Sequence, residues 1–201
     1  MLTFTPRLKT IKPTNCRNCS TCSRQYFHAF LISHMVKIIA ADNTHIPVIV
    51  EIAETTWNAT YTTLLTPEAM RYMLDTIYSE GELQRIMSNG SQKFLMIKDS
   101  DGYQGFASFG VRKEDPSVYK LHKIYVLPNN QGKGFGKLLI EEVKRQVLMN
   151  GGRILDLNVN RQNPAQEFYK KLGFSIIRQE DVPIGQYYMM DYVMRLNLEE
   201  F

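Results

Sequence analysis

Three glycines alternate with other residues in the segment QGKGFGK, residues 131–137. The segment follows an apolar run that ends at Leu127 and precedes a stretch with helical spacing. The first N–H groups of a helix have no partner inside the helix, and the helix dipole attracts negative charge to them. Glycine adds close access to the backbone and permits positive φ. We therefore predict that this segment binds a phosphate group.

Two common phosphate-binding motifs do not fit these residues. A P-loop requires a serine or threonine after its Gly-Lys pair to hold magnesium, but Leu138 follows Gly136 and Lys137 here. A dinucleotide fingerprint requires G-x-G-x-x-G near the start of a parallel sheet. Here single residues separate the glycines, and three predicted strands precede them. Asp156 lies at a suitable distance for the ribose ligand, but it falls inside a predicted strand and not at its end.

A second motif lies downstream of the glycine segment. The first motif reads Q-x-x-G-x-G after the strand ending IYVLP, and the second reads N-x-x-A-x-x-F-Y-x-x-x-G-F. The second motif is supplied by Asn160 or Asn163 with Ala165, Phe168, Tyr169, Gly173 and Phe174. Together the two motifs resemble the GCN5-related N-acetyltransferases (GNAT). The resemblance covers residues 36 to about 196.

The resemblance implies acetyl-CoA as the cosubstrate and a set of residues that bind it. In that family the glycine loop binds the pyrophosphate, and the preceding strand separates from the next parallel strand so that its backbone pairs with the pantetheine arm. A backbone N–H near Tyr125 would polarise the thioester carbonyl. The implied cofactor-binding residues are Ile124, Tyr125, Val126, Gln131, Gly132, Lys133, Gly134, Phe135, Gly136, Lys137, Asn158 and Asn163.

Two residues are candidates for proton transfer. By resemblance, Tyr169 is the general acid that protonates the departing thiolate; the alternative is a packed aromatic side chain. His122 stands where polyamine-acetylating relatives often have a glutamate, and it is the candidate base; the alternative is a surface residue of a strand. No cysteine follows residue 22, so we expect direct attack by the amine in a ternary complex and no cysteinyl acyl-enzyme.

The acceptor is predicted less sharply than the cofactor. Residues 54–97 are similar to the N-terminal half of bacterial spermidine/spermine N-acetyltransferases, which suggests a small-molecule primary amine such as a polyamine. The alternatives are acetylation of a protein N-terminus or lysine, and a non-catalytic acetyl-CoA-binding module. We expect neither nucleic acid nor membrane as a partner, no metal ion, and a cytoplasmic location, and we allow for a homodimer.

The elements that must position these residues follow an orderly pattern. Predicted strands cover residues 36–40, 92–99, 103–111, 117–127, 153–159, 174–181 and 187–196, and predicted helices cover residues 46–61, 66–78, 79–87, about 135–150 and 163–174. The turn signal at residues 100–102 makes the second and third strands a hairpin. We predict an α/β fold with a mixed, mostly antiparallel central sheet of about seven strands flanked by helices.

The N-terminal residues have a different composition. Residues 1–34 contain five basic residues and no acid, and the remaining chain has 19 basic and 20 acidic residues. The net charge of +4 therefore says little about the partners of the folded part. Cys16, Cys19 and Cys22 could bind a metal with His28 or His34. We instead expect residues 1–34 to be disordered or not native, with one GNAT domain over residues 35–201; a transit peptide is a further alternative.

Overall fold

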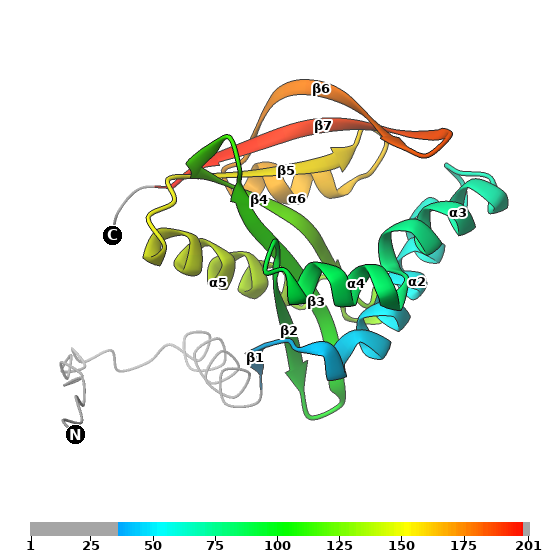
Figure 1. Ribbon diagram of the computed structural model, residues 1–201, viewed down its shortest axis with the longest axis horizontal. Coiled ribbons are helices and arrows are strands. Elements are labelled where there is room, and N and C mark those ends of the chain that lie inside the picture. Colours follow the sequence, from blue (N-terminus) through cyan, green and yellow to red (C-terminus); the bar gives the residue numbers. More distant parts are fainter. Residues whose placement is uncertain (1–35, 199–201) are drawn as a thin grey trace, which may run out of the picture. The chain divides into compact units, whose positions relative to one another are not determined.

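Seven strands form one mixed sheet in the computed structural model, which describes residues 36–198 (Figure 1). The predicted fold class is confirmed, and the predicted elements are present with ends that shift by a few residues. The extension with Cys16, Cys19 and Cys22 lies outside the described residues. The strands are β1 (Lys37–Ala40), β2 (Lys93–Asp99), β3 (Gly102–Arg112), β4 (Asp115–Val126), β5 (Ile154–Asn160), β6 (Ser175–Ile184) and β7 (Tyr187–Asn197).

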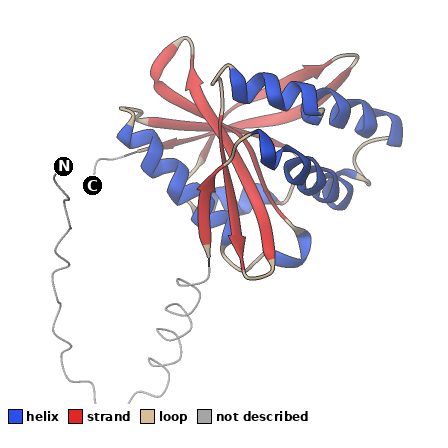
Figure 2. Cartoon of the chain, turned by 60° about the horizontal axis from the view of Figure 1, so that its bottom comes forward, coloured by secondary structure: helices blue, strands red, loops and turns tan. Residues whose placement is uncertain are grey.

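The helices cover both faces of this sheet (Figure 2). They are α2 (Ile46–Tyr61), α3 (Pro67–Tyr78), α4 (Glu80–Ser88), α5 (Phe135–Met149) and α6 (Ala165–Lys171), with short 3-10 turns at Asn43–His45 and Pro128–Asn130. Because side chains alternate along a strand, β2 supplies both cores. Leu95 and Ile97 pack with α5, whereas Phe94 and Met96 pack with α2. Within residues 36–198, no helix is long and apolar enough to cross a membrane.

The strand order is β1-β2-β3-β4-β5-β7-β6, and only the β4–β5 pair is parallel. That pairing runs from Val118 opposite Ile154 to Leu121 opposite Leu157 and then ends. From His122 onward β4 therefore has a free edge on its β5 side, while it stays paired with β3 as far as Val126. A parallel sheet that opens in this way exposes backbone N–H and C=O groups to a ligand.

A β-bulge marks the point where β4 and β5 separate. Lys123 pairs with Ser108, but Leu121 pairs with Phe109, so His122 is an extra residue on β4. The bulge changes which residues point to which face. Leu121, Ile124 and Val126 contact the α5 side, whereas Tyr125 contacts the side of α2, α3 and α4. As a result, β4 residues after the bulge reach both the α5 face of the sheet and the face covered by α2, α3 and α4.

Candidate active site

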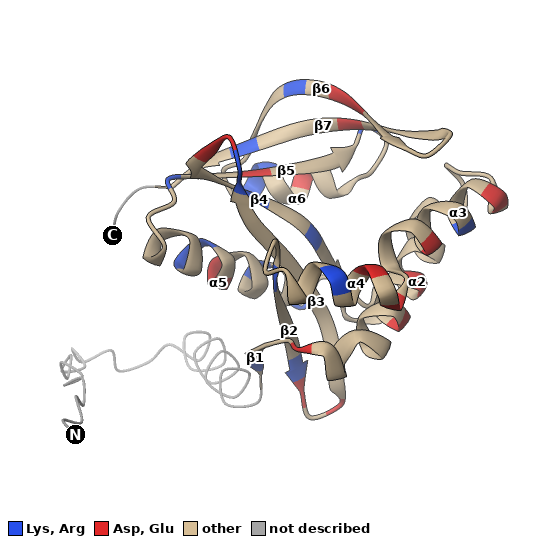
Figure 3. Ribbon diagram, in the orientation of Figure 1, with Lys and Arg blue, Asp and Glu red and all other residues tan. Residues whose placement is uncertain are grey.

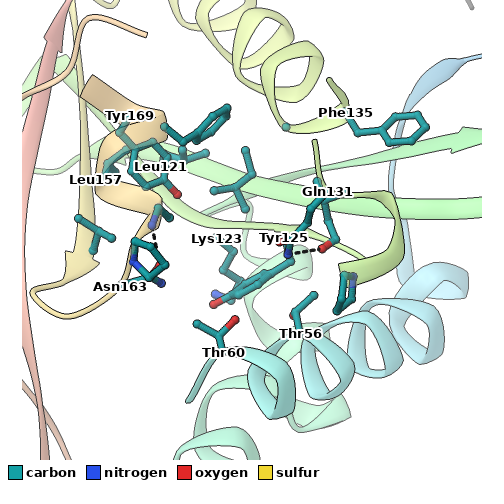
Figure 4. Close-up of a pocket in the computed structure, with 18 of the residues that line it drawn as sticks. Thr56, Thr60, Leu121, Lys123, Tyr125, Gln131, Phe135, Leu157, Asn163 and Tyr169 are labelled. Atoms are coloured by element: carbon teal, nitrogen blue, oxygen red, sulfur yellow. Dashed lines mark hydrogen bonds between the residues drawn. The ribbon is translucent and has the colours of Figure 1, made fainter. Parts of the chain in front are cut away.

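A cavity of about 850 Å³ extends from the separated ends of β4 and β5 to the N-terminus of α5, with α2 and α6 on its sides (Figure 4). Most residues predicted to bind the cofactor or to transfer protons line it. They are His122, Ile124, Tyr125, Val126, Gln131, Gly132, Gly134, Phe135, Gly136, Lys137, Asn158, Asn163 and Tyr169. Lys133 does not line the cavity, and its ammonium donates a hydrogen bond to Oδ1 of Asn130 (2.6 Å).

Unpaired backbone amides gather at the start of α5. Gly134 is the N-cap residue with φ of +92°, and it has no side chain with which to cap the helix. The first helical hydrogen bond runs from the Leu138 N–H to the Gly134 C=O (3.0 Å). The N–H groups of Phe135, Gly136 and Lys137 therefore have no partner among the described residues. Gly132 also has positive φ, +78°, and so the loop has the geometry of an anion site.

The three glycines of the loop have different roles in the structure. A Cβ at Gly132 or Gly134 would meet no atom within 4 Å, so their positive φ is what favours glycine there. Gly136 is helical, and a Cβ on it would lie 3.2 Å from Cζ of Phe168. A side chain larger than that of glycine at position 136 would require Phe168 of α6 to shift by a few tenths of an ångström. Gly136 thus allows α5 to pack closely against α6, the helix that carries Tyr169.

Tyr169 lies in the cavity wall with its hydroxyl directed inward (Figure 4). Its side chain is only 8% exposed and packs against Phe174 and Phe168. The hydroxyl has no hydrogen-bond partner among residues 36–198. Burial first, and then Tyr125, raises the pKa of Tyr169, so the phenol stays protonated at physiological pH. The hydroxyl can therefore serve as a proton donor in the cavity.

His122 is the bulged residue of β4 and also lines the cavity. The side chain of His122 is exposed at the edge of the cavity. Partial loss of solvation there lowers the pKa of His122, and the positive charges of Lys123, Lys120 and Arg112 act in the same direction. The imidazole is thus neutral at physiological pH but weakly basic. A carboxylate beside a histidine raises the pKa of the imidazole, whereas the cations near His122 lower it.

The two predicted asparagines lie at the β5 side of the cavity. Oδ1 of Asn163 accepts a hydrogen bond from the Ala165 N–H (2.9 Å) and so caps the first turn of α6 (Figure 4). Asn158 donates from Nδ2 to Oε2 of Glu180 (2.9 Å), while its buried Oδ1 has no partner in the described part of the chain. This oxygen is therefore an unsatisfied acceptor enclosed by the protein.

Several cavity residues were not predicted from the sequence. Thr56, Ala59, Thr60 and Tyr61 of α2 form one wall, and Lys123 of β4 also lines the cavity. The helical pattern of residues 46–61 predicts a buried face, but it does not tell which residues of that face meet a site. Lys123 gave no such signal, because strict alternation would place Lys120 and Lys123 on opposite faces, whereas the bulge at His122 puts both on the same face of the sheet.

Tyr125 links the cavity to an aromatic cluster through its hydroxyl. The hydroxyl oxygen accepts hydrogen bonds from Nε1 of Trp57 (3.0 Å) and from the hydroxyl of Tyr78 (2.8 Å). Both donors belong to buried side chains. Tyr125 therefore joins α2 and α3 to β4 at the point where the two strands have separated.

Replacing Tyr125 with phenylalanine should destabilise the fold. The substitution leaves the Trp57 N–H and the Tyr78 hydroxyl without their acceptor, and an unsatisfied buried polar group costs about 1–3 kcal/mol. Denaturant unfolding of Tyr125→Phe should therefore show a lower midpoint than the wild type. Tyr169→Phe is the comparison, because it removes a hydroxyl without a protein partner. Equal unfolding midpoints for the wild type and Tyr125→Phe would show that these two hydrogen bonds contribute nothing to the stability of the fold.

Comparison with known protein families identifies one family model that matches most of the described residues. The family model described as "Acetyltransferase (GNAT) domain" matches residues 61–188. This range includes the open edge of β4, the glycine loop and α6. Within residues 36–198, no group of three or more His, Cys, Asp or Glu side chains could hold a metal ion.

Individual relatives agree with this match. An uncharacterised N-acetyltransferase of Mycobacterium bovis is 29% identical over 129 residues, 64% of this chain and 81% of the relative. The [ribosomal protein bS18]-alanine N-acetyltransferase of Haemophilus influenzae is 32% identical over 92 residues, 45% of this chain and 61% of the relative. The crystal structure of PaiA N-acetyltransferase from Thermoplasma acidophilum in complex with coenzyme A superposes with a TM-score of 0.69 and 24% identity, covering 81% and 98% of the two chains. The resemblance to spermidine/spermine N-acetyltransferases is not supported by these comparisons.

Proposed function

Because the chain belongs to the GNAT acetyltransferase family, we propose that it transfers the acetyl group of acetyl-CoA to a primary amine of a small molecule. It is an N-acetyltransferase, and acetyl-CoA is its cosubstrate. The observation that carries the proposal is the set of unpaired amides at the start of α5, which opens into the same cavity as the free edge of β4.

The residues of the cavity suit acetyl-CoA in two places. The amides of Phe135, Gly136 and Lys137 bind the diphosphate, since anions are stabilised at a helix N-terminus. The open edge of β4 from Ile124 to Val126 binds the pantetheine arm by backbone hydrogen bonds, as an added strand would. Asn158 lines the cavity beside this arm. When bound, acetyl-CoA supplies the thioester that the acceptor nitrogen attacks.

The chemistry requires positioning, charge stabilisation and two proton transfers. All three cysteines precede residue 35, so the acceptor nitrogen attacks the thioester carbonyl directly, and proximity supplies much of the acceleration. A backbone N–H of β4 near Tyr125 stabilises the negative charge that develops on the carbonyl oxygen. The carbon–sulfur bond then breaks, and the Tyr169 hydroxyl gives its proton to the sulfur.

His122 accepts the proton that the acceptor amine loses, directly or through water. Its low basicity means that the proton passes on to solvent. We expect His122→Gln to lower kcat/KM for an alkylamine by ~10², the lower end of the range for general bases. For 2,2,2-trifluoroethylamine, which is largely unprotonated at neutral pH, the loss should be small. An equal loss for both amines would remove the proton-transfer role.

The acceptor can be identified with a panel of amines assayed for release of CoA. The panel contains small primary amines, spermidine as the polyamine candidate, and a peptide with a free N-terminus and a lysine. The peptide tests acetylation of a protein, which the bS18-alanine acetyltransferase relative makes a second candidate. Turnover of small amines above the rate with the peptide supports the proposal. Binding of acetyl-CoA without any turnover would favour a non-catalytic binding module.

A further inference from the structure

Lys123 places a positive charge in the interior beside the cavity. Its side chain is 7% exposed, yet the residue lines the cavity (Figure 4). The ammonium donates a hydrogen bond to Oε1 of Gln92 (3.2 Å), an oxygen that also accepts from the Ser108 hydroxyl (2.9 Å). It lies over the rings of Tyr78 and Phe94, at 5.7 and 5.8 Å from the ring centroids. All these contacts are with neutral groups.

No carboxylate among residues 36–198 forms an ion pair with Lys123. Glu82 is the acid that raises its pKa, but both carboxylate oxygens of Glu82 accept hydrogen bonds from Arg85 (2.7 Å each). Burial outweighs Glu82, Lys120 adds a like charge, and the pKa of Lys123 falls to about 8. The side chain is still mostly protonated at pH 7. Buried charges in proteins are normally paired, so this ammonium lacks a partner that a ligand could supply.

The position of Lys123 separates it from the phosphate loop. An extended strand rises about 3.3 Å per residue, so Lys123 lies roughly 13 Å along the chain before Leu127, where the loop begins. Its contacts, Tyr78 and Phe94, belong to the core that α2 and α4 cover, and not to the core of α5. A diphosphate at the start of α5 therefore does not reach Lys123. An anion beside Lys123 would belong to the acceptor.

The surrounding charges favour the same kind of acceptor. Between Val118 and Val126, β4 carries two lysines, one histidine and no acid (Figure 3). Lys123, Lys120 and Arg112 all lower the pKa of His122, so the positive field extends along this edge of the cavity. Glu180 and Asp191 offset part of this charge at Lys120, but the charges that act on His122 are all positive. At the bulge the field therefore favours a carboxylate over a polycation.

We propose that Lys123 binds a carboxylate of the acceptor, so that the acceptor is an amino acid or another small amine that carries a carboxylate. The proposal rests on the proposed acetyl transfer and specifies its substrate class. The lysine ammonium has three donors, and the Gln92 contact uses one of them. The carboxylate accepts from another and fixes the acceptor on the α2 side of β4.

Pairs of acceptors with and without a carboxylate test the proposal. L-Leucine is compared with L-leucinamide, and 5-aminopentanoate with 1-aminopentane, with spermidine as the polycation. For the wild type, kcat/KM should be at least tenfold higher for the carboxylate member of one pair. Lys123→Met should bring that ratio close to one, and Lys123→Arg, which keeps the charge, should retain part of it. Lys144→Met is the control, since Lys144 pairs with Glu141 on α5.

Binding measurements keep the proposal testable whatever the turnover. Calorimetry with acetyl-CoA alone should give the same affinity for the wild type and Lys123→Met. If the wild type did not bind acetyl-CoA at all, that result would refute the proposed function and not the role of Lys123. Calorimetry of each matched pair against the protein with CoA should show tighter binding of the carboxylate member, and Lys123→Met should remove the difference. No preference in the wild type, or a preference that survives in Lys123→Met, overturns the proposal. Thermal unfolding checks that Lys123→Met is folded.

Discussion

Gly134→Asp is expected to abolish detectable binding of acetyl-CoA while the protein stays folded. A Cβ at Gly134 meets no atom within 4 Å, so the substitution causes no clash and only the strain of positive φ, about 1–2 kcal/mol. The new carboxylate would stand at the N-cap of α5, beside the amides that we propose for the diphosphate. Two like charges ~4 Å apart near a protein surface repel by about 4 kcal/mol, which corresponds to roughly 10³-fold in affinity. Calorimetry with acetyl-CoA measures this loss.

Gly134→Asn separates charge from strain. Asparagine has nearly the same size as aspartate, tolerates positive φ and can also cap the helix, but it carries no charge. We expect Gly134→Asn to weaken binding by about tenfold, far less than Gly134→Asp. Unchanged affinity in Gly134→Asp, with a normal unfolding transition, would rule out the loop as the diphosphate site.

Tyr169→Phe is expected to lower kcat by ~10²–10⁴, the range for loss of a positioned general acid. The substitution removes only a hydroxyl that has no protein hydrogen bond in the described residues, so the packing with Phe168 and Phe174 remains. Affinity for acetyl-CoA, measured by calorimetry, should therefore change little. Turnover is followed by the release of CoA with the best amine of the panel.

Tyr119→Phe serves as the control for this result. Tyr119 is another tyrosine of the same core, and it does not line the cavity. Its substitution should leave turnover and affinity as in the wild type. If Tyr169→Phe retained full turnover, the thiolate would have to take its proton from elsewhere, and Tyr169 would be a packing residue. A parallel loss of cofactor affinity would likewise argue against the role of an acid.

The sequence alone determined the features that depend on neighbouring residues. The hairpin of β2 and β3 follows from two apolar runs around residues 100–102, and the start of α5 follows from the glycines before an amphipathic stretch. The loop's capacity for an anion also follows locally, because unpaired amides at a helix N-terminus need no distant partner. The resemblance to the GNAT family added Tyr169, which lies in the same cavity as the loop.

Only the tertiary structure decided which residues of β4 face α5 and which face α2, α3 and α4. The bulge at His122 and the end of pairing at Leu121 arise from the register with β3 and β5, which lie on other parts of the chain. The same register sends Lys123 inward between Tyr78 and Phe94 and leaves it without an acidic partner in residues 36–198. The wall formed by α2 likewise depends on packing across more than 60 residues of sequence. A sequence pattern shows which side chains are buried, but contacts between distant elements determine what they face.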